Sequence, residues 1–260
     1  MGTKIFKIVN ISITFVILIF IISTLGTVLI KGFPGIFSSI KSPELLFAIK
    51  LSLETSVIST LACLVVSIPI AYTLSRYNLK GTNIIITLLR IPLTLPPIVS
   101  GVSLLLLFGT TSFGDFLSKL GLSFIFNIKG IIIAQFFVNL PSMITILKAA
   151  IEGVDIRLEY VARTLGFSPL KAFCKVTLPI IRNNILAALI LTWSKALGEF
   201  GAVLMLAGAI RFKTETLPMA IYLNMSVGDL DAVMVSSSIL IIISIISLSV
   251  FELADIELYK

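Results

Sequence analysis

Two charged side chains, Lys195 and Glu199, lie four positions apart inside an apolar run long enough to cross a membrane. A charge within a membrane span costs about 2.5 to 3.5 kcal/mol on insertion scales, so each one requires an explanation. Their spacing places them on one helix face, where they can neutralise each other as a structural ion pair. Alternatively, Lys195 faces a polar path and attracts a tetrahedral dianion, while Glu199 holds the ammonium in place. The residues alone leave both interpretations open.

A second unusual stretch contains Pro92, Pro96 and Pro97 and is followed by Gly101. Proline removes a backbone donor and bends or breaks a helix. Broken helices are tolerated at membrane depth where neighbouring protein or an aqueous cavity satisfies the freed carbonyls. We therefore expect this stretch either to line a path or gate or to form a static kink.

Small residues form a stripe around the two charges. Ser194, Gly198 and Ala202 recur at four-residue spacing, and Gly201 adds to them. Such stripes let helix backbones approach closely in lipid, where van der Waals contact drives association. The stripe predicts a centrally packed helix, either within the bundle of one chain or at a dimer seam or pore wall.

Several chemistries are excluded by the residues that the chain lacks. There is no histidine, and therefore no imidazole ligand for zinc and no Ser-His or Cys-His nucleophile pair. No Gly-x-x-x-x-Gly-Lys-Ser/Thr phosphate loop and no carboxylate cluster for magnesium is present. The two cysteines, Cys63 and Cys174, are far apart and are expected to be packed small side chains and not a redox pair.

The composition indicates the elements that must hold these residues. The chain has 260 residues, of which 57% are hydrophobic and 13% charged, and its mean hydropathy is +1.13. A soluble fold needs roughly a quarter of its residues charged. A membrane span takes about 20 apolar helical residues. The sequence predicts an all-α membrane protein with six spans near Ile8–Ile30, Leu51–Leu74, Ile84–Phe108, Gly130–Ala150, Ile185–Ala209 and Val233–Phe251.

The basic residues fall between these spans and predict the orientation. With the N-terminus in the cytoplasm, eleven Lys and Arg residues, Lys260 among them, lie inside and seven outside. This bias has the sign of the positive-inside rule and places both termini in the cytoplasm. No basic stripe interleaved with aromatic residues is present, so the net charge of +7 does not point to nucleic acid.

The longest hydrophilic connection, Ile151–Asn184, reads as two short helices joined by a turn. Asp155 can cap the first helix, Gly166 suits the left-handed residue that ends it, and Ser168 with Pro169 can start the second, which Pro179 closes. The first helix carries a row of apolar residues, Leu158, Val161, Ala162 and Leu165. This row either binds a protein partner or folds against the chain's own bundle.

This connection resembles a known signature. Glu, two residues, Ala, three residues, Gly and a later Leu-Pro recur here as Glu159, Ala162, Gly166, Phe173, Leu178 and Pro179. The pattern resembles the cytoplasmic loop of permease subunits of binding-protein-dependent ABC importers. The resemblance implies that the loop docks on a separate ATPase subunit through coupling residues Glu159, Ala162, Arg163, Gly166, Ser168, Phe173, Leu178 and Pro179.

Two further stretches resemble the oxyanion branch of that family, the molybdate, tungstate and sulfate permeases. They are the proline-rich third span and the segment Ala196–Ala202 with Ala207, Gly208 and Thr214–Pro218. Within the second stretch, Gly198–Tyr222 is most similar to the molybdate type. Lys195 stands where that branch usually has Arg, and Ala209 where Asn is common. The resemblance covers 51–251 of a single permease domain, 1–260, whose coupling loop is 151–184.

The resemblance implies a type I ABC importer permease in the cytoplasmic membrane that carries an oxyanion, molybdate or tungstate first and sulfate second. The partners are a second copy of the chain, two ABC ATPase subunits that hold ATP and magnesium, an external oxyanion-binding protein and the lipid bilayer. The chain itself is expected to have no catalytic residue, metal or cofactor. Residues assigned to the path or gate are Pro96, Pro97, Gly101, Lys195, Gly198, Glu199 and Gly201.

Two other classes compete with this interpretation. An autonomous secondary transporter or channel predicts internal repeats and intramembrane acids for ion coupling, and only Glu54 and Glu199 offer such acids. An intramembrane enzyme would need a base beside Ser103, and a chain without histidine does not provide one.

Overall fold

The computed structural model describes residues 2–39 and 41–258, which fold into helices with no β-strand among them. Four helices are long and apolar enough to cross a membrane: α1 (Gly2–Ser39), α2 (Pro43–Arg76), α6 (Ile128–Glu152) and α13 (Leu230–Leu258). Two bent helix pairs bring the number of spans to six. This arrangement confirms the all-α fold with six spans. Lys260, assigned above to the cytoplasmic side, lies outside the described residues.

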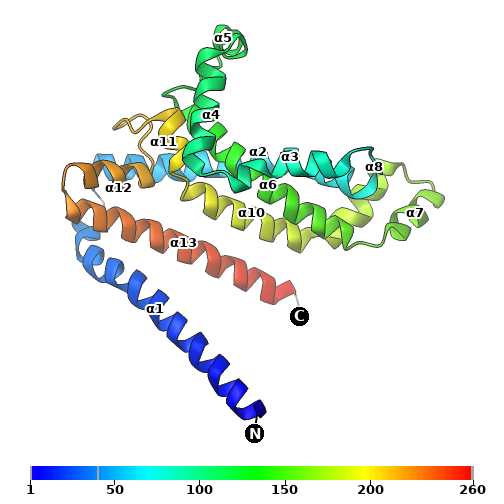
Figure 1. The fold of residues 1–260 in the computed structure, drawn as a ribbon, viewed down its shortest axis with the longest axis horizontal. Coiled ribbons are helices and arrows are strands. Elements are labelled where there is room, and N and C mark those ends of the chain that lie inside the picture. Colours follow the sequence, from blue (N-terminus) through cyan, green and yellow to red (C-terminus); the bar gives the residue numbers. More distant parts are fainter. Residues whose placement is uncertain (1, 40, 259–260) are drawn as a thin grey trace.

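The first bent pair is α3 (Thr82–Thr94) with α4 (Pro97–Thr110), whose axes differ by 110°. α4 stands nearly across α3 and leads to the short helix α5 (Ser112–Lys119) (Figure 1). The break falls between Thr94 and Pro97, as the prolines predict. Pro96 occupies the position before the first turn of α4, and Pro97 occupies the first turn, where a missing backbone N–H costs nothing.

The second bent pair consists of the short helices over Pro169–Ile180 and helix α10 (Arg182–Leu197), bent by 73°. The fifth span was predicted to continue to Ala209, and this is wrong. Helix α10 ends at Leu197, and a separate helix, α11 (Gly201–Ala207), follows. The small-residue stripe therefore does not form one helix face, because the break separates Ser194 from Ala202.

Helix α2 is the central element of the bundle. It packs along α6 and also contacts α10 and α12 (Leu217–Ser226). Three buried hydroxyls on α2, those of Thr55, Ser56 and Ser59, donate hydrogen bonds to the helix's own backbone, as Thr55 does to the carbonyl of Leu51 at 2.8 Å. Ser59 donates a hydrogen bond across the bundle to Gln135 of α6 at 3.1 Å. These bonds make a polar helix face compatible with a membrane interior.

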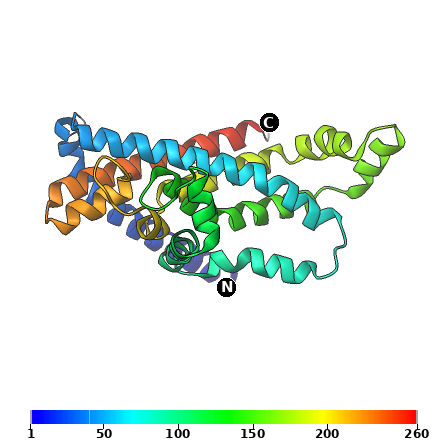
Figure 2. The ribbon, with the colours of Figure 1, turned by 90° about the horizontal axis from the view of Figure 1, so that it is seen from above.

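Three apolar clusters lie along this bundle. One joins α4, α6 and α11, a second joins α2, α6, α10 and the short helices before it, and a third joins α2, α12 and α13. Helix α1 packs on α13 through its C-terminal part and diverges from it toward the N-terminus, where its apolar side chains are exposed (Figure 1). The short helices of the connection project at the end of the molecule opposite α12 (Figure 2).

Candidate functional site

The short helices before α10 form a bent unit that we call the elbow: α7 (Ile156–Thr164), α8 (Pro169–Ala172), the π-helical turn η1 (Phe173–Thr177) and α9 (Leu178–Ile180). Asp155 caps α7 by accepting a hydrogen bond from the N–H of Arg157 at 2.9 Å. Gly166 has a φ of 91° and ends the helix. Ser168 caps α8 by accepting from the N–H of Lys171 at 3.3 Å. The predicted caps and turn are thus all present.

Pro179 lies in a different place from the one expected. It does not close the second helix, because it occupies the first turn of α9, which ends one residue later at Ile180. The π-helical turn immediately before α9 changes the hydrogen-bond register, so the missing N–H of Pro179 breaks no regular helix bond. The bend toward α10 occurs at Ile181 instead.

The apolar row of α7 divides between two faces. Ala162 is buried, whereas Leu158, Val161 and Leu165 are 46%, 57% and 77% exposed. Leu170 on α8 adds a further exposed side chain, at 72%. The chain's own bundle therefore covers only one side of the elbow, and its apolar outer face lies open beside several basic residues.

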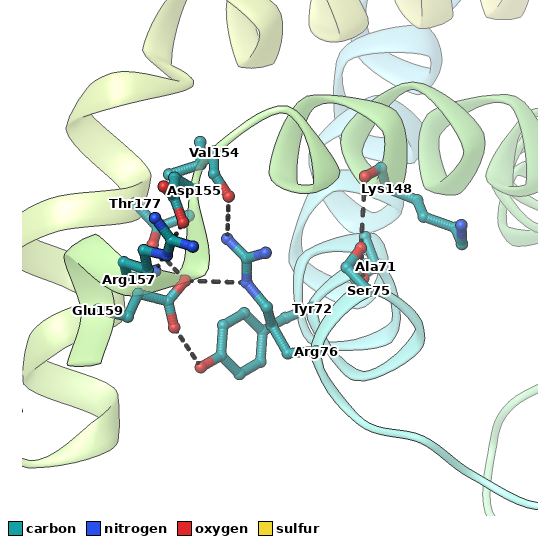
Figure 3. A network of polar contacts seen from close by, with 10 residues as sticks. All are labelled: Ala71, Tyr72, Ser75, Arg76, Lys148, Val154, Asp155, Arg157, Glu159 and Thr177. Atoms are coloured by element: carbon teal, nitrogen blue, oxygen red, sulfur yellow. Dashed lines mark hydrogen bonds and ion pairs between the residues drawn. The ribbon is translucent and has the colours of Figure 1, made fainter.

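Glu159 belongs to the covered side and is only 5% exposed. Its Oε1 lies 3.0 Å from Nε of Arg76, the last residue of α2, and accepts a hydrogen bond from Thr177 at 2.6 Å. Its Oε2 accepts from the hydroxyl of Tyr72 at 2.9 Å. Arg76 also donates through Nη2 to the carbonyl of Val154 at 2.9 Å. Figure 3 shows how these side chains converge between α2 and the elbow.

The remaining coupling residues fall into two groups. Phe173 and Leu178 pack into the apolar cluster beneath the elbow, and the ring of Phe173 lies 4.7 Å from that of Tyr72. Arg163, Gly166, Ser168 and Pro179 are exposed. The elbow thus has one group of residues that attach it to the bundle and another that faces outward.

Three of the predicted path residues, Pro97, Gly101 and Gly201, lie where α4 meets α11. Helix α4 follows the break before Pro97 and α11 follows the break after Leu197, so we call this contact the double break. Gly101 of α4 lies against α11 so closely that a Cβ there would be 2.7 Å from the carbonyl oxygen of Ala202. Gly201 of α11 lies against the start of α4, where a Cβ would be 3.0 Å from Cβ of Pro97. The two glycines therefore allow the two backbones to touch. Pro96, Pro97 and Gly198 remain exposed beside this contact.

The expected ion pair between Lys195 and Glu199 is not formed among the described residues. Helix α10 ends between them, so they do not share a helix face. Glu199 instead accepts a hydrogen bond from the N–H of Ala202 at 3.0 Å, at the start of α11. Lys195 is exposed and donates to the hydroxyl of Ser142 at 3.1 Å. An exposed ammonium is therefore left on this surface of the bundle.

The partners of these charges were not predicted from the sequence. Arg76 is one of the eleven basic residues placed on the cytoplasmic side, and no contact was assigned to it or to Tyr72, Thr177 and Ser142. Tyr72 and Arg76 are four residues apart at the end of a span, which places them on one helix face. That spacing is the one signal that could have indicated their joint role, although it does not name the carboxylate they contact.

The cysteines also differ from expectation in one respect. Cys63 is buried in the apolar cluster between α2 and α6, as predicted, but Cys174 is exposed on the elbow. It lies on the outer side of η1, whose inner side is occupied by Phe173 and Thr177. Within the described ranges, no group of three or more Cys, Asp or Glu side chains is arranged to hold a metal ion.

Six apolar spans with an elbow at one end define a polytopic membrane protein. Residues 64–255 match the family described as "Binding-protein-dependent transport system inner membrane component", and the chain belongs to this family. It is therefore a permease subunit of an ABC importer.

Particular relatives narrow the comparison. The chain is 33% identical to the molybdenum transport system permease protein ModB of Mycobacterium tuberculosis over 87% of its own length and 86% of that protein. It is 34% identical to a probable molybdenum ABC transporter permease protein of Haloferax volcanii, covering 84% of this chain and 78% of that one. Its fold is similar to a chain of a bacterial ABC transporter involved in alginate import, with a TM-score of 0.74, 17% identity and coverage of 97% and 93%.

Proposed function

We propose that two copies of this chain form the membrane channel of an ATP-driven importer for an oxyanion, with molybdate or tungstate as cargo. The observation that carries the coupling part is the outer face of the elbow, where Leu158, Val161 and Leu165 are open to a partner. A half-apolar, basic helical surface outside the membrane supports a docking role, because exposed apolar patches of this kind mark interaction sites.

In this proposal two ABC ATPase subunits bind the two elbows and hold the ATP and magnesium. Closure of the ATPase pair brings the elbows together and tilts the spans, so that an inward-facing cavity opens to the outside. Hydrolysis then resets the channel. The chain's own part is mechanical, because the elbow is attached to α2 and to α10 and so carries displacement into two spans.

The cargo assignment is supported by the relatives and by Lys195. Its exposed ammonium contacts Ser142 of α6, and a cation on the path attracts a dianion. Glu199 is held at the start of α11 and its carboxylate is engaged by a backbone N–H. An external binding protein delivers the anion to the side opposite the elbow. Both termini then lie in the cytoplasm.

Reconstitution into vesicles tests the proposal. The permease would be combined with its copurified ATPase and binding protein, and uptake of labelled molybdate would be measured with and without ATP. We expect uptake only when all three proteins and ATP are present, with competition by excess unlabelled tungstate. Uptake by this chain alone would support an autonomous transporter instead. Stronger competition by sulfate than by tungstate would identify sulfate as the preferred cargo.

A further inference from the structure

The buried pair Arg76–Glu159 lies at a junction of four elements. Arg76 ends α2, Glu159 lies on α7, Thr177 lies on η1, and the carbonyl of Val154 belongs to the turn after α6. Both charged side chains are only 7% exposed. The same end of α2 contacts α6 directly: the hydroxyl of Ser75 donates to the carbonyl of Ala71 at 2.7 Å and lies 3.3 Å from the carbonyl of Lys148.

The carboxylate of Glu159 is fully engaged inside the chain. Its two oxygens accept hydrogen bonds from Arg76, Tyr72 and Thr177, at distances between 2.6 and 3.0 Å. Removing one partner of a buried pair leaves an uncompensated charge, which is far more costly than breaking a surface pair. The elbow therefore cannot separate from α2 without a large free-energy penalty.

This placement separates two roles that a charged residue in the elbow could have. A docking contact must be reachable by the partner, as the exposed side chains of Leu158, Val161 and Arg163 are. Glu159 points away from that face toward α2 (Figure 3). Its hydrogen-bonding capacity is used by its own chain, so it is suited to transmitting a displacement and not to receiving the partner.

Helix α2 can carry such a displacement across the whole bundle. Near its other end, Ser52 accepts a hydrogen bond from the N–H of Leu217, the first residue of α12, at 2.7 Å. In its middle, Ser59 contacts Gln135 of α6, which in turn donates to the carbonyl of Ala196 in α10 at 2.9 Å. A movement of α2 at the elbow end is thus passed to α6, α10 and the α12 end through direct hydrogen bonds.

We propose that Arg76, Tyr72 and Thr177 act with Glu159 as positioning residues, a buried linkage that makes the elbow and α2 move as one body. The linkage rests on the proposed function, since it transmits the displacement that a docked ATPase produces. It assigns Glu159 to transmission within the chain, and leaves docking to the exposed face of the elbow.

The test uses the complete complex in vesicles, with Arg76→Gln and Glu159→Gln as variants. Three quantities are measured: the ATPase copurified per permease, the ratio of ATP hydrolysis with and without binding protein, and molybdate uptake. We expect the ATPase to copurify, while the stimulation ratio and the uptake fall about tenfold, within the usual range of coupling between sites. The double swap Arg76→Glu with Glu159→Arg should restore part of the stimulation.

Lys148→Gln and Glu152→Gln are the matched controls. These residues form an ion pair at 2.5 Å at the same end of α6, but within one helix and partly exposed, so their loss should leave the stimulation ratio unchanged. If a charge variant fails to insert, Tyr72→Phe and Thr177→Val remove one hydrogen bond each and leave the ion pair in place. We expect about a threefold loss of stimulation from each, the effect of one hydrogen bond.

The outcomes distinguish the linkage from the proposed function. Loss of the copurified ATPase from Glu159→Gln, with normal insertion, would make Glu159 a docking residue and overturn the linkage while leaving the importer intact. Wild-type stimulation and uptake in all four variants would also overturn it. If the wild-type chain itself copurifies no ATPase, the proposed function fails.

Discussion

The elbow junction and the double break solve the problem of irregular backbone in a membrane protein in opposite ways. At the junction, α2 and the elbow meet through the buried ion pair Arg76–Glu159 and the hydrogen bond from Tyr72 to Glu159. Thr177 and the carbonyl of Val154 hold the two charged side chains in place. At the double break, α4 and α11 are in close backbone contact at Gly101 and Gly201, and steric fit holds them together. The first contact is directional and resists separation. The second depends on close approach of two helix backbones.

Under the proposed function, this difference assigns force transmission to the elbow junction and shape change to the double break. A region that must transmit force benefits from directional bonds, because they fix both distance and orientation. A region that must change shape benefits from contacts that can slide, because no single bond has to break. Pro96 and Pro97 contribute to this second region by leaving α3 and α4 as separate helices joined by a short turn.

Gly101→Val should have the largest effect, because it disrupts the contact between α4 and α11. The added side chain meets the backbone of Ala202 and Cβ of Met205 at 2.7 Å, and backbone cannot move aside. Overpacking of this kind costs about 1–3 kcal/mol and more when backbone is involved. We expect a large loss of folded protein, measured by thermal unfolding in detergent. Gly198→Ala is the control, since its nearest neighbour would be 3.8 Å away; equal melting temperatures would show that the glycine contact is not tight.

Gly166→Val should distort the elbow through backbone strain and not through steric crowding. No atom lies within 4 Å of a Cβ at this position, so the whole effect comes from the φ of 91°. An L-residue loses about 1–2 kcal/mol in left-handed backbone, and a β-branched one more. We expect about a tenfold loss of copurified ATPase with normal insertion.

Gly153→Ala provides the control for this variant. It lies at the end of α6 with a φ of −69°, which alanine adopts freely. Its copurification yield should match that of the wild type. Wild-type yield and transport in Gly166→Val would contradict the assignment of the elbow as the docking segment.

Lys195→Met tests whether the ammonium of Lys195 lies on the path of the anion. Loss of one charge about 8 Å from a dianion weakens the attraction by about 1 kcal/mol in a water-filled path, or about fivefold in uptake. Lys195→Arg keeps the charge and should retain uptake. The measurement is the initial rate of labelled molybdate uptake in vesicles. An unaltered rate in Lys195→Met would remove this residue from the path.

Glu215, in the loop after α11, should give the smallest effect, a change in how the free energy of unfolding depends on pH. It is fully buried, and burial raises its pKa, with the neighbouring carboxylate of Glu44 adding to the rise. The N–H of Phe212 and the guanidinium of Arg211 oppose it. Because the folded state then binds a proton that the unfolded state has released, stability should fall as pH rises from about 4.3, the ordinary glutamate value, through the raised pKa.

Thermal unfolding of the wild type and of Glu215→Gln over a pH series measures this contribution. The variant should lose this part of the decline in stability with pH, because its amide does not titrate. Parallel curves for the two proteins would show that the buried carboxyl contributes nothing to the pH dependence. Glu159 has an ion pair of its own with Arg76. The guanidinium near Glu215, that of Arg211, forms its ion pair with Glu44 instead.

Local features were predictable where neighbouring residues alone decide them. The caps at Asp155 and Ser168, the turn at Gly166 and the break before Pro97 all appear where the sequence places them. The break after Leu197 was not predicted, because an apolar run from Ile185 to Ala209 is compatible with one straight helix. Its cause lies in packing: the close contact of Gly201 with α4 requires α11 to take a separate direction.

Helical membrane spans and a capped elbow outside the membrane follow from the residue order alone. Run length, hydropathy and turn residues act over a few neighbouring positions, so no knowledge of packing is needed. The partner of each charged side chain, in contrast, is known only from the tertiary structure. Glu159 pairs with an arginine 83 positions away, and Lys195 turns to Ser142 and not to Glu199. Such partners depend on how distant helices pack, because a buried charge is stabilised by whichever group the fold brings beside it.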